Sequence, residues 1–393
     1  MLKFNPNKTN CTGCSACYSI CPVHCISMNP DKEGFKYPTA SSACTNCKLC
    51  EKVCPLNNEK REHTHKQTAY AAVSKDYKVW QRSASGGAFS EIVRHWSDKE
   101  SLIVGAVWDN LAVHHVAVIG YENIAPLCKS KYVASSIEDT FIEIRKHLRN
   151  GKKAIFCGCP CQVDGLRHFL IKDYENLLTI DLICHGQASP LVFKECMKAI
   201  GEQLGEEVVS YEFRTKRRVY EEDYLSKITT KKSTYYTSHD TYQKLFFSQD
   251  ILRPSCGFNC KYRDTRRPGH ITIADCRGLT KIFPDLVGHK RNYSTIVSNS
   301  EKGDEVVSRL SKTMKIRKYE IEDVIKYNPL FAHQTWASKN RDSFFRQFIE
   351  NPSATIKART TELKIKKIGI KQLIMSYLPA WFIKKYSNIK IKL

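Results

Sequence analysis

The sequence predicts an α+β protein in which a small cysteine-rich domain is followed by a larger mixed α/β domain and a basic tail. Nine of the 18 cysteines lie within residues 11–54. From residue 68 onward, short apolar strand-like segments alternate with segments of helical periodicity. Residues 353–393 contain ten Lys or Arg and one acidic residue, Glu362. At 393 residues the chain exceeds what one hydrophobic core usually organises, so at least two domains are expected.

The N-terminal cysteines form two runs with the same spacing, C-x2-C-x2-C-x3-C, and a proline follows each run. This spacing is typical of domains that hold two [4Fe-4S] clusters, in which the fourth cysteine of each run binds the cluster of the other run. We therefore expect one cluster at Cys11, Cys14, Cys17 and Cys54, and a second cluster at Cys44, Cys47, Cys50 and Cys21. In length and in its expected strands, the segment resembles a bacterial-type 2[4Fe-4S] ferredoxin.

Zinc is the competing interpretation, because C-x2-C pairs are also common in zinc sites. A zinc site has no use for the third and fourth cysteine of each run, so the two-cluster interpretation is favoured. The expected strands are Cys25–Met28 and Phe35–Pro38, joined by a turn at Asp31–Gly34. Cys25 belongs to neither run and is predicted to be a small buried residue.

Composition divides the chain into four parts. Residues 1–57 form the cysteine-rich domain, 58–67 a polar linker, 68–350 the larger domain and 351–393 the basic tail. His63 and His65 in the linker could form a metal pair, but a solvated linker is the favoured interpretation.

The larger domain is predicted to mix strands and helices throughout. Strands are expected at Thr68–Ser74, Leu102–Trp108, Val113–Ile119, Lys153–Phe156, Leu178–Cys184, Val208–Phe213, Lys227–Thr230, His270–Asp275 and Ser294–Ser298. Helices are expected at Gly86–Trp96, Ile137–Leu148, Gln162–Ile171 and Pro190–Ile200. The two strands on either side of Asp109–Asn110 are expected to form a hairpin.

Three loops of this domain lie where a predicted strand gives way to a helix. The first, Arg82–Gly87, ends in two glycines, and free N–H groups at such a helix start can bind a phosphate or a flavin pyrophosphate. It matches neither the dinucleotide fingerprint nor the P-loop. The other two loops, Cys157–Gln162 and Cys184–Gly186, carry cysteines. Because successive strand ends lie along one edge of a sheet, these sulfurs and those of Cys256 and Cys260 can converge on a third cluster.

The ordered set of motifs resembles the coenzyme F420 hydrogenase/dehydrogenase beta-subunit family, in the form with a fused N-terminal 2[4Fe-4S] ferredoxin. The matching segments are Ser85–Gly87 (S-G-G), Ser130–Val133 (S-K-Y-V), Pro160–Leu166 (P-C-Q-V-x-G-L), Cys184–Gly186 (C-H-G) and Arg253–Asp275 (R-x-S-C-x-x-C…D). The resemblance spans about residues 1–345. The sequence departs from the family pattern in spacing Cys256 and Cys260 as C-x3-C, and in carrying Cys157, Cys159 and Cys276.

The resemblance implies a mixed α/β flavin domain in which FAD exchanges electrons with the clusters and with a soluble donor or acceptor. The implied cofactor contacts are Ser85, Gly86, Gly87, Lys131 and Tyr132. The candidate ligands of an additional [4Fe-4S] cluster are Cys161, Cys184, Cys256 and Cys260. A set of buried thiols is the alternative for these four residues. His185, at a strand end, is the candidate proton donor.

The expected function is that of an iron–sulfur flavoprotein oxidoreductase acting on a small-molecule redox substrate, with coenzyme F420 as one candidate. The alternative is a non-catalytic electron-relay subunit of a larger redox complex, and flavin content separates the two. The charge of +22 also raises the question of nucleic acid, but the sequence lacks helix-turn-helix and aromatic RNA-binding motifs. We therefore expect no nucleic-acid partner.

Charge and hydropathy predict where the protein acts and with what. The N-terminus has no signal peptide and the chain no uninterrupted apolar run of 18 residues, so a cytoplasmic protein is expected. The cysteine-rich domain has six Lys against three acidic residues, which suits an acidic electron carrier of the ferredoxin or flavodoxin type. Lysines mixed with Trp, Phe and Ile in Thr360–Leu393 suit peripheral contact with the inner face of the membrane, or packing on the domain or on a second subunit, including a homo-oligomer.

Overall fold

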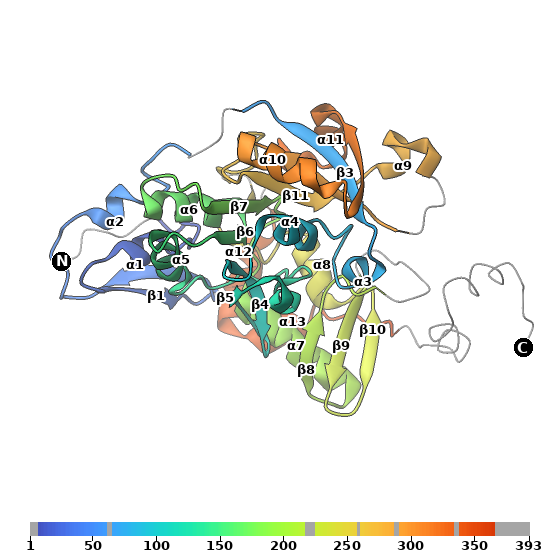
Figure 1. Ribbon diagram of the computed structural model, residues 1–393. Coiled ribbons are helices and arrows are strands. Elements are labelled where there is room, and N and C mark those ends of the chain that lie inside the picture. Colours follow the sequence, from blue (N-terminus) through green and yellow to red (C-terminus); the bar gives the residue numbers. More distant parts are fainter. Residues whose placement is uncertain are drawn as a thin grey trace, which may run out of the picture.

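A computed structural model describes residues 7–60, 65–216, 225–257, 260–286, 291–333 and 338–365. Figure 1 shows a small N-terminal domain that lies against the side of a larger α/β domain. The predicted combination of a small N-terminal domain and a mixed α/β domain is confirmed. In the described part of the chain, no helix is both long and apolar enough to cross a membrane.

The N-terminal domain contains two short helices and one hairpin. The helices are α1 (Ala16–Ile20) and α2 (Leu49–Lys52), and the antiparallel strands are β1 (Ile26–Pro30) and β2 (Lys36–Ala40). The Asp31 side chain accepts hydrogen bonds from the N–H groups of Glu33 and Phe35, and Gly34 adopts a φ of +90°. These contacts form the predicted turn and hold the hairpin closed.

The larger domain is organised around an eight-stranded sheet with the order β13-β3-β12-β11-β7-β6-β4-β5. The strands are β3 (Thr68–Ser74), β4 (Leu102–Asp109), β5 (Ala112–Ile119), β6 (Ala154–Gly158), β7 (Leu177–Leu182), β11 (Ile271–Asp275), β12 (Ser294–Ser298) and β13 (Met314–Tyr319). Strands β4, β6, β7 and β11 are parallel, whereas the strands outside them pair antiparallel. The loops that follow β6, β7 and β11 therefore leave the sheet at one edge.

Helices cover both faces of this sheet (Figure 1). On one face lie α4 (Ala88–Trp96) and α10 (Glu301–Leu310), and on the other lie α5 (Thr140–Arg149) and α6 (Pro160–Leu170). Strand β6 alternates between these layers, because Ile155 packs with α4 and α10 while Ala154 and Phe156 pack with α5 and α6. Ala16 of the N-terminal domain belongs to the same hydrophobic cluster as α5 and α6. The two domains thus share one core.

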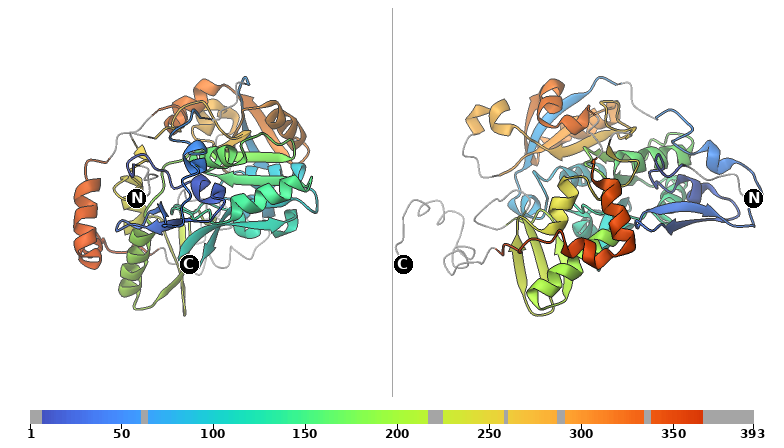
Figure 2. Two further views of the ribbon diagram at one scale, coloured as in Figure 1. Left: turned by 90° about the vertical axis from the view of Figure 1, so that its left-hand side faces the viewer. Right: turned by 180° about the vertical axis from the view of Figure 1, so that it is seen from behind.

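A second, smaller sheet extends from the main body beside a group of helices (Figure 2). Its strands are β8 (Val208–Glu212), β9 (Ser226–Thr230) and β10 (Thr234–Thr237), and the helices are α7 (Pro190–Leu204), α8 (Thr241–Phe247), α12 (Arg341–Glu350) and α13 (Pro352–Lys357). Helix α13 packs on α7, and Ile356 is fully buried. Residues 352–357 therefore belong to the folded body, whereas residues 366–393 of the predicted tail lie outside the described residues. The remaining helices are α3 (Tyr77–Gln81), α9 (Leu279–Ile282) and α11 (Ile321–Tyr327).

The described ends of the predicted linker are held against the larger domain. Lys60 Nζ lies 2.6 Å from Asp264 Oδ1, and its side chain is only 3% exposed. His65 Nε2 lies 2.7 Å from Asp304 Oδ2. The prediction of a solvated linker is wrong at these positions, because a local polar pattern does not reveal partners about 200 residues away. His63 lies outside the described residues.

Candidate functional site

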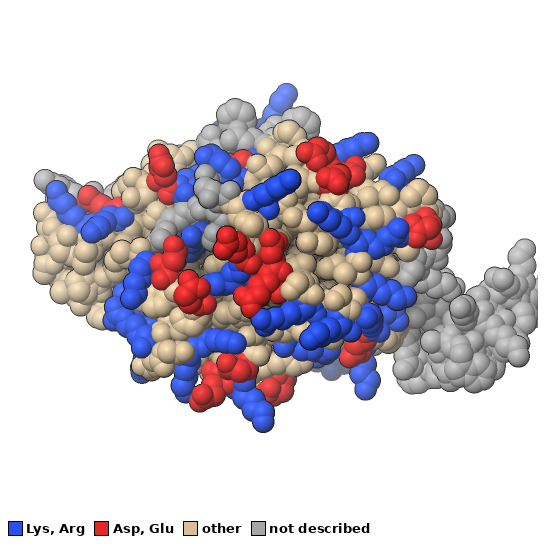
Figure 3. Space-filling view, turned by 45° about the horizontal axis from the view of Figure 1, so that its top comes forward, with Lys and Arg blue, Asp and Glu red and all other residues tan. Residues whose placement is uncertain are grey.

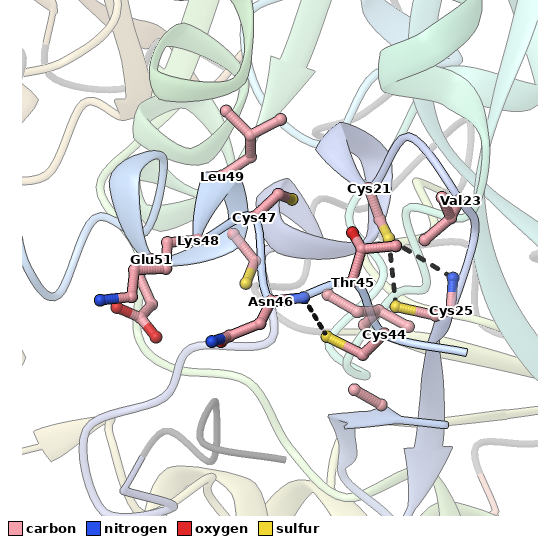
Figure 4. A pocket seen from close by; sticks show the side chains of 13 residues that line it. Cys21, Val23, Cys25, Cys44, Thr45, Asn46, Cys47, Lys48, Leu49 and Glu51 are labelled. Atoms are coloured by element: carbon pink, nitrogen blue, oxygen red, sulfur yellow. Dashed lines mark hydrogen bonds between the residues drawn. The ribbon is translucent and has the colours of Figure 1, made fainter. Parts of the chain in front are cut away.

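Two pockets in the N-terminal domain are each lined by four of the eight motif cysteines. The first pocket is lined by Cys11, Cys14, Cys17 and Cys54, and the second by Cys21, Cys44, Cys47 and Cys50. Each pocket takes three cysteines from one run and the fourth from the other run, which is the crossed arrangement expected from the spacing. Figure 4 shows the second pocket, with Cys21 from the first run and Cys44 and Cys47 from the second.

The backbone repeats in the two runs in a way that fits metal–sulfur clusters. Gly13 and Asn46 occupy the same position of each run, with φ values of +67° and +57°. Ser15 and Lys48 also correspond, with φ values of +65° and +59°. Left-handed residues alternating with other conformations turn backbone N–H groups inward and form concave anion sites, as in many iron–sulfur sites. The four thiols of each pocket and this backbone together fit a [4Fe-4S] cluster.

The two pockets differ in their exposure to solvent. The four thiol residues of the first pocket are 7–8% exposed. In the second pocket, Cys47 is exposed, while Cys44 and Cys50 are half-buried. Burial raises the pKa of Cys14 to about 12, so this thiol stays protonated at neutral pH unless a metal displaces the proton. The second pocket is therefore the one that a partner protein can reach.

Cys25 lies beside the second pocket, although it belongs to neither run. Its Sγ is 3.4 Å from Cys21 Sγ, and its backbone N–H donates to that same sulfur at 3.4 Å (Figure 4). The prediction that Cys25 is buried is confirmed. Among the described residues, no three His, Cys, Asp or Glu side chains are grouped closely enough to hold a single metal ion.

The first pocket lies against α6 of the larger domain through one glycine. A Cβ atom at residue 165 would lie 2.7 Å from Cys14 Cβ and 2.8 Å from Cys14 Sγ, so only glycine permits this contact. Cys161 precedes Gly165 by one helical turn and so lies on the same side of α6. The phenol of Tyr262 donates to Asp164 Oδ2 at 2.7 Å. Burial raises the pKa of Tyr262, and Asp164, Cys161 and Cys14 raise it further, which places the phenol near both cysteines.

Arg253 connects the two domains at the same junction. Its Nε donates to Cys11 O at 2.8 Å, and its Nη2 donates to Lys36 O at 2.7 Å. Its guanidinium lies over the Tyr37 ring, 4.3 Å from the centroid. The backbone N–H of Arg253 donates to Gln187 O at 2.8 Å. One side chain thus links the backbone of the first cysteine run to the segment that carries Cys256.

The structure brings together the four cysteines predicted to hold a third cluster. Burial, and then the nearby sulfurs of Cys184, Cys256 and Cys260, raise the pKa of Cys161 well above its ordinary value. These cysteines come from α6, from the end of β7 and from the loop between α8 and β11. Cys159 joins them, because its Sγ lies 3.7 Å from Cys184 Sγ. The adjacent Cys159 thiol lowers the pKa of Cys184 to about 7.

The other cysteines of the larger domain lie elsewhere. Burial raises the pKa of Cys157 to about 12, and this thiol faces Asp181 and Lys131 rather than the group around Cys184. Cys276 lies beside Thr295 and Tyr319 in the core on the β3 side of the sheet. A cysteine at the end of a strand therefore does not by itself belong to the group around Cys184.

Hydrogen bonds within the protein fix the position of the S-G-G loop, Ser85–Gly87. Ser85 Oγ donates to Tyr293 O at 2.7 Å, and Gly86 N–H donates to Ser294 Oγ at 2.9 Å. A Cβ atom at residue 86 would lie 2.1 Å from Ala72 O, so this glycine allows the loop to pack on β3 and β12. Gly87 begins α4 with a φ of +98°, and the buried carboxylate of Glu91 lies in the first turn of that helix.

The S-K-Y-V segment lies close to this loop. Lys131 Nζ donates to the carbonyl oxygens of Pro126 and Cys128 at 2.9 and 2.6 Å, and burial lowers the pKa of Lys131 to about 8. The Tyr132 ring stacks on Phe246 at 4.9 Å between centroids. Both predicted contact residues therefore lie at the carboxyl edge of the sheet, with Lys131 engaged by the backbone.

Arg214 joins the two loops, and its sequence context did not point to it. Its guanidinium donates to Asp275 Oδ2 at 2.6 Å, to Tyr132 Oη at 3.3 Å and to Ala84 O at 3.2 Å. Lys216 Nζ donates to Ser85 O at 2.5 Å. Arg214 adopts a φ of +57°, which is uncommon for a non-glycine residue. A basic residue after a strand carries no recognisable sequence signal, so only the fold reveals this position.

His185, the candidate for proton transfer, lies in an aromatic environment. Its Nε2 lies 3.0 Å from Phe246 O, and its ring is 4.6 Å from the Phe246 ring between centroids. Burial lowers the pKa of His185 to about 4, so the imidazole is neutral at pH 7. Its hydrogen bond to a carbonyl oxygen indicates that the proton is on Nε2.

Comparisons with known proteins give two family matches and a structural match. Residues 151–324 match the family model for the C terminus of the coenzyme F420 hydrogenase/dehydrogenase beta subunit, and residues 10–58 match the "4Fe-4S dicluster domain". A chain of the structure titled "Xenon derivatization of the F420-reducing [NiFe] hydrogenase complex from Methanosarcina barkeri" is 14% identical, with a TM-score of 0.45. The match covers 76% of this chain and 91% of that chain. No curated protein matches the sequence. The chain therefore combines a region that matches the C terminus of the coenzyme F420 hydrogenase/dehydrogenase beta subunit with an N-terminal 4Fe-4S dicluster domain.

Proposed function

We propose that this chain is an iron–sulfur flavoprotein oxidoreductase that passes electrons between [4Fe-4S] clusters and a small-molecule substrate at FAD. The observation that supports it best is a series of sulfur-lined positions that leads inward from the surface. The exposed second pocket comes first, the buried first pocket follows, and the cysteine group at the sheet edge lies beyond Gly165. Such a series suits the stepwise movement of single electrons.

The proposed cluster ligands are the thiols that line the two pockets and the group at the sheet edge. The first two clusters are held by Cys11, Cys14, Cys17 and Cys54 and by Cys21, Cys44, Cys47 and Cys50. A third cluster is held by Cys161, Cys184, Cys256 and Cys260. The residues at the junction, Gly165, Arg253 and Tyr262, keep the first and third positions adjacent.

The proposed flavin site is the edge of the sheet at which Arg214 links the S-G-G loop to the S-K-Y-V segment. Guanidinium and ammonium groups of Arg214 and Lys216 suit the phosphates of a dinucleotide, and the Tyr132 ring suits an aromatic one. Ser85, Gly86 and Gly87 give the loop its shape. When bound, a flavin exchanges electrons singly with clusters and in pairs with an organic substrate. The buried carboxylate of Glu91 disfavours a phosphate at the start of α4 itself.

We propose that His185 serves proton transfer as an acceptor rather than as the donor expected from the sequence, because burial lowers its pKa to about 4 and leaves the imidazole neutral. With the proton on Nε2 donated to Phe246 O, Nδ1 keeps a lone pair that can receive a proton. The low pKa of His185 makes it a weak base, so it would pass the proton on rather than hold it. The substrate class is a small redox molecule such as a deazaflavin, a nicotinamide or a quinone.

A non-catalytic electron-relay subunit is the second candidate, and one observation favours it. The Ser85 hydroxyl, the Gly86 N–H and the Lys131 ammonium group all donate hydrogen bonds within the protein. Donors that are bonded within the protein are not free to bind a flavin phosphate, as expected for a chain that no longer binds flavin. In that case the enzyme that reduces the substrate would be another subunit of the same complex.

The proposed partner is an acidic electron-carrier protein that docks at the second pocket. Lys48 and Lys52 are exposed beside the exposed Cys47, and opposite charge on a carrier would speed the encounter. On the face shown in Figure 3, by contrast, Lys and Arg are interspersed with Asp and Glu. We further propose that the protein acts in the cytoplasm, within a complex of several subunits or a homo-oligomer, and that residues 360–393 contact the membrane surface.

The flavin content of the anaerobically purified protein tests this function. We expect about one FAD per chain, either retained during purification or taken up on reconstitution. A protein that contains no FAD after reconstitution would instead support the electron-relay subunit. Lys216→Gln should weaken FAD retention about tenfold, because a charge-assisted hydrogen bond contributes about 1.5–3 kcal/mol. Lys315→Gln removes the same charge from the exposed side of β13 and should leave FAD retention unchanged.

A further inference from the structure

Arg263 is a buried cation that lies beside the second cysteine group. It follows Cys260 by three residues and is 4% exposed. Its Nη2 donates to His185 O at 2.5 Å, while its buried Nη1 has no hydrogen-bond partner within the described part of the chain. Among the described residues, it forms no ion pair with an acidic side chain. Because burying an uncompensated charge is strongly unfavourable, an anion is expected beside it.

Arg267, four residues further along the same segment, provides the contrast. It is 1% exposed, and its Nη2 lies 2.7 Å from Asp181 Oδ1. Its Nη1 donates to Tyr262 O at 3.1 Å, and its Nε lies 3.3 Å from Thr272 Oγ1. The fold therefore supplies a full set of partners to one buried guanidinium of this segment and leaves the other with a spare donor.

The groups next to Arg263 are the sulfurs of the second cysteine group. The guanidinium adds to the Cys159 thiol in lowering the pKa of Cys184, and it opposes the effect of burial on the pKa of Cys256 and Cys260. Gln187 approaches the same sulfurs from another direction. Its backbone N–H donates to Cys256 Sγ and its Nε2 to Cys161 Sγ, both at 3.3 Å.

We propose that Arg263 is the counter-charge of an anionic metal–thiolate centre held by Cys161, Cys184, Cys256 and Cys260, and that it raises the reduction potential of this centre. The inference rests on the proposed function, which places a cluster at these residues. Adding one electron makes the centre more negative by one charge. A fixed cation beside it therefore stabilises the reduced form more than the oxidised form.

The test compares the full-length protein with Arg263→Gln and Arg263→Lys after anaerobic purification. Iron per chain is measured first, and the reduced fraction of each centre is then followed by electron paramagnetic resonance during a redox titration. The signal of the third centre is the one that disappears in Cys184→Ala. Arg263→Gln should lower the ratio of reduced to oxidised centre at least tenfold at a given potential, which corresponds to about 59 mV for one electron. Arg263→Lys, which keeps the charge, should retain most of the potential.

Loss of about four irons from Arg263→Gln with the other eight retained would also support the proposal, since outer-shell substitutions commonly cost about 10–100-fold in metal affinity. Arg145→Gln is the control, because it removes the same charge from α5, where the guanidinium covers the Phe169 ring. An unchanged potential with full iron in Arg263→Gln would overturn the role of Arg263. About eight irons in the wild-type protein would instead overturn the third centre itself. If Arg263→Gln does not fold, Arg263→Met removes the same charge with a side chain of similar length, and an unchanged potential with full iron in Arg263→Met would equally overturn the role of Arg263.

Discussion

The pockets of the N-terminal domain and the cysteine group at the sheet edge collect sulfur atoms in opposite ways. Each pocket uses two short runs whose spacing and left-handed residues repeat, so the chain itself brings the thiols together. The group at the edge draws Cys161, Cys184, Cys256 and Cys260 from segments up to 99 residues apart, and it forms only once β6, β7 and β11 are aligned. The first kind of site depends on local sequence, and the second depends on the whole fold.

The largest expected effect is the loss of one cluster from a variant in the other cysteine run. Cys54→Ala lies in the second run but removes a thiol from the first, buried pocket. We expect the protein to lose about four irons while the exposed cluster remains and reacts with an iron chelator. Cys21→Ala should do the reverse and leave the protected cluster. If Cys54→Ala instead removed the exposed cluster, the crossed arrangement would be wrong.

The sheet edge that carries the second cysteine group should depend on the buried ion pair between Arg267 and Asp181 for its stability. Arg267→Met leaves the Asp181 carboxylate without its cation in a fully buried position. Breaking such a pair typically costs about 3–5 kcal/mol of unfolding free energy. Denaturant unfolding of the apoprotein measures the loss. Arg309→Met, at an exposed position of α10, is the control and is expected to stay within about 0.5 kcal/mol. Equal stability of the two variants would show that the ion pair does not hold the sheet edge together.

The junction between the two regions should respond to added volume at one position. Gly165→Val places side-chain atoms where Cys14 lies, and overpacking of this kind costs about 1–3 kcal/mol. It should also weaken the magnetic interaction between the first and third clusters, because the domains must move apart. Gly201→Ala in α7 is the matched control, since its Cβ would meet Glu206 O at 2.8 Å far from any cysteine pocket. If the magnetic interaction in Gly165→Val were unchanged, the first and third clusters would not approach each other at this junction.

The smallest expected effect concerns pH. Burial lowers the pKa of His115 to about 4 from an ordinary value of 6.5, so the folded state favours the neutral imidazole. The unfolded chain then binds the proton more readily, and stability falls as pH decreases below about 6.5 until it levels off near 4. Between pH 7 and 5.5 the loss is about 1 kcal/mol. His115→Phe cannot be protonated, so its stability should fall less over this range, and parallel curves for both proteins would contradict the assignment.

Much of the fold follows from local patterns. The prediction of β3 at Thr68–Ser74 is confirmed with the same bounds, and the hairpin at Asp109–Asn110 is confirmed as β4 and β5. Strand β13 was missed, because its M-K-I-R-K-Y sequence places charges on an edge strand whose exposed face needs no apolar residue. The short helix α8 was missed because seven residues give too little periodicity to recognise.

The site was predictable only where its residues are close in sequence. The eight motif cysteines follow from spacing, whereas the loops that carry Cys159 and Cys184 were predicted to converge, but the sequence did not indicate which of their sulfurs meet. Gln187, Arg214 and Arg263 are ordinary polar residues in the sequence, and their roles arise from contacts with residues 26 to 130 positions away. Long-range contacts of this kind carry no local pattern, so the fold is needed to find them.

The most direct test of the proposed series of clusters is the iron and acid-labile sulfide content per chain, measured on anaerobically purified wild-type protein and on Cys184→Ala. We expect about twelve irons in the wild type and about eight in Cys184→Ala, with the signals of the two N-terminal clusters unchanged. About eight irons in both proteins would contradict a third cluster at the sheet edge, and the electron path would then end at the first pocket.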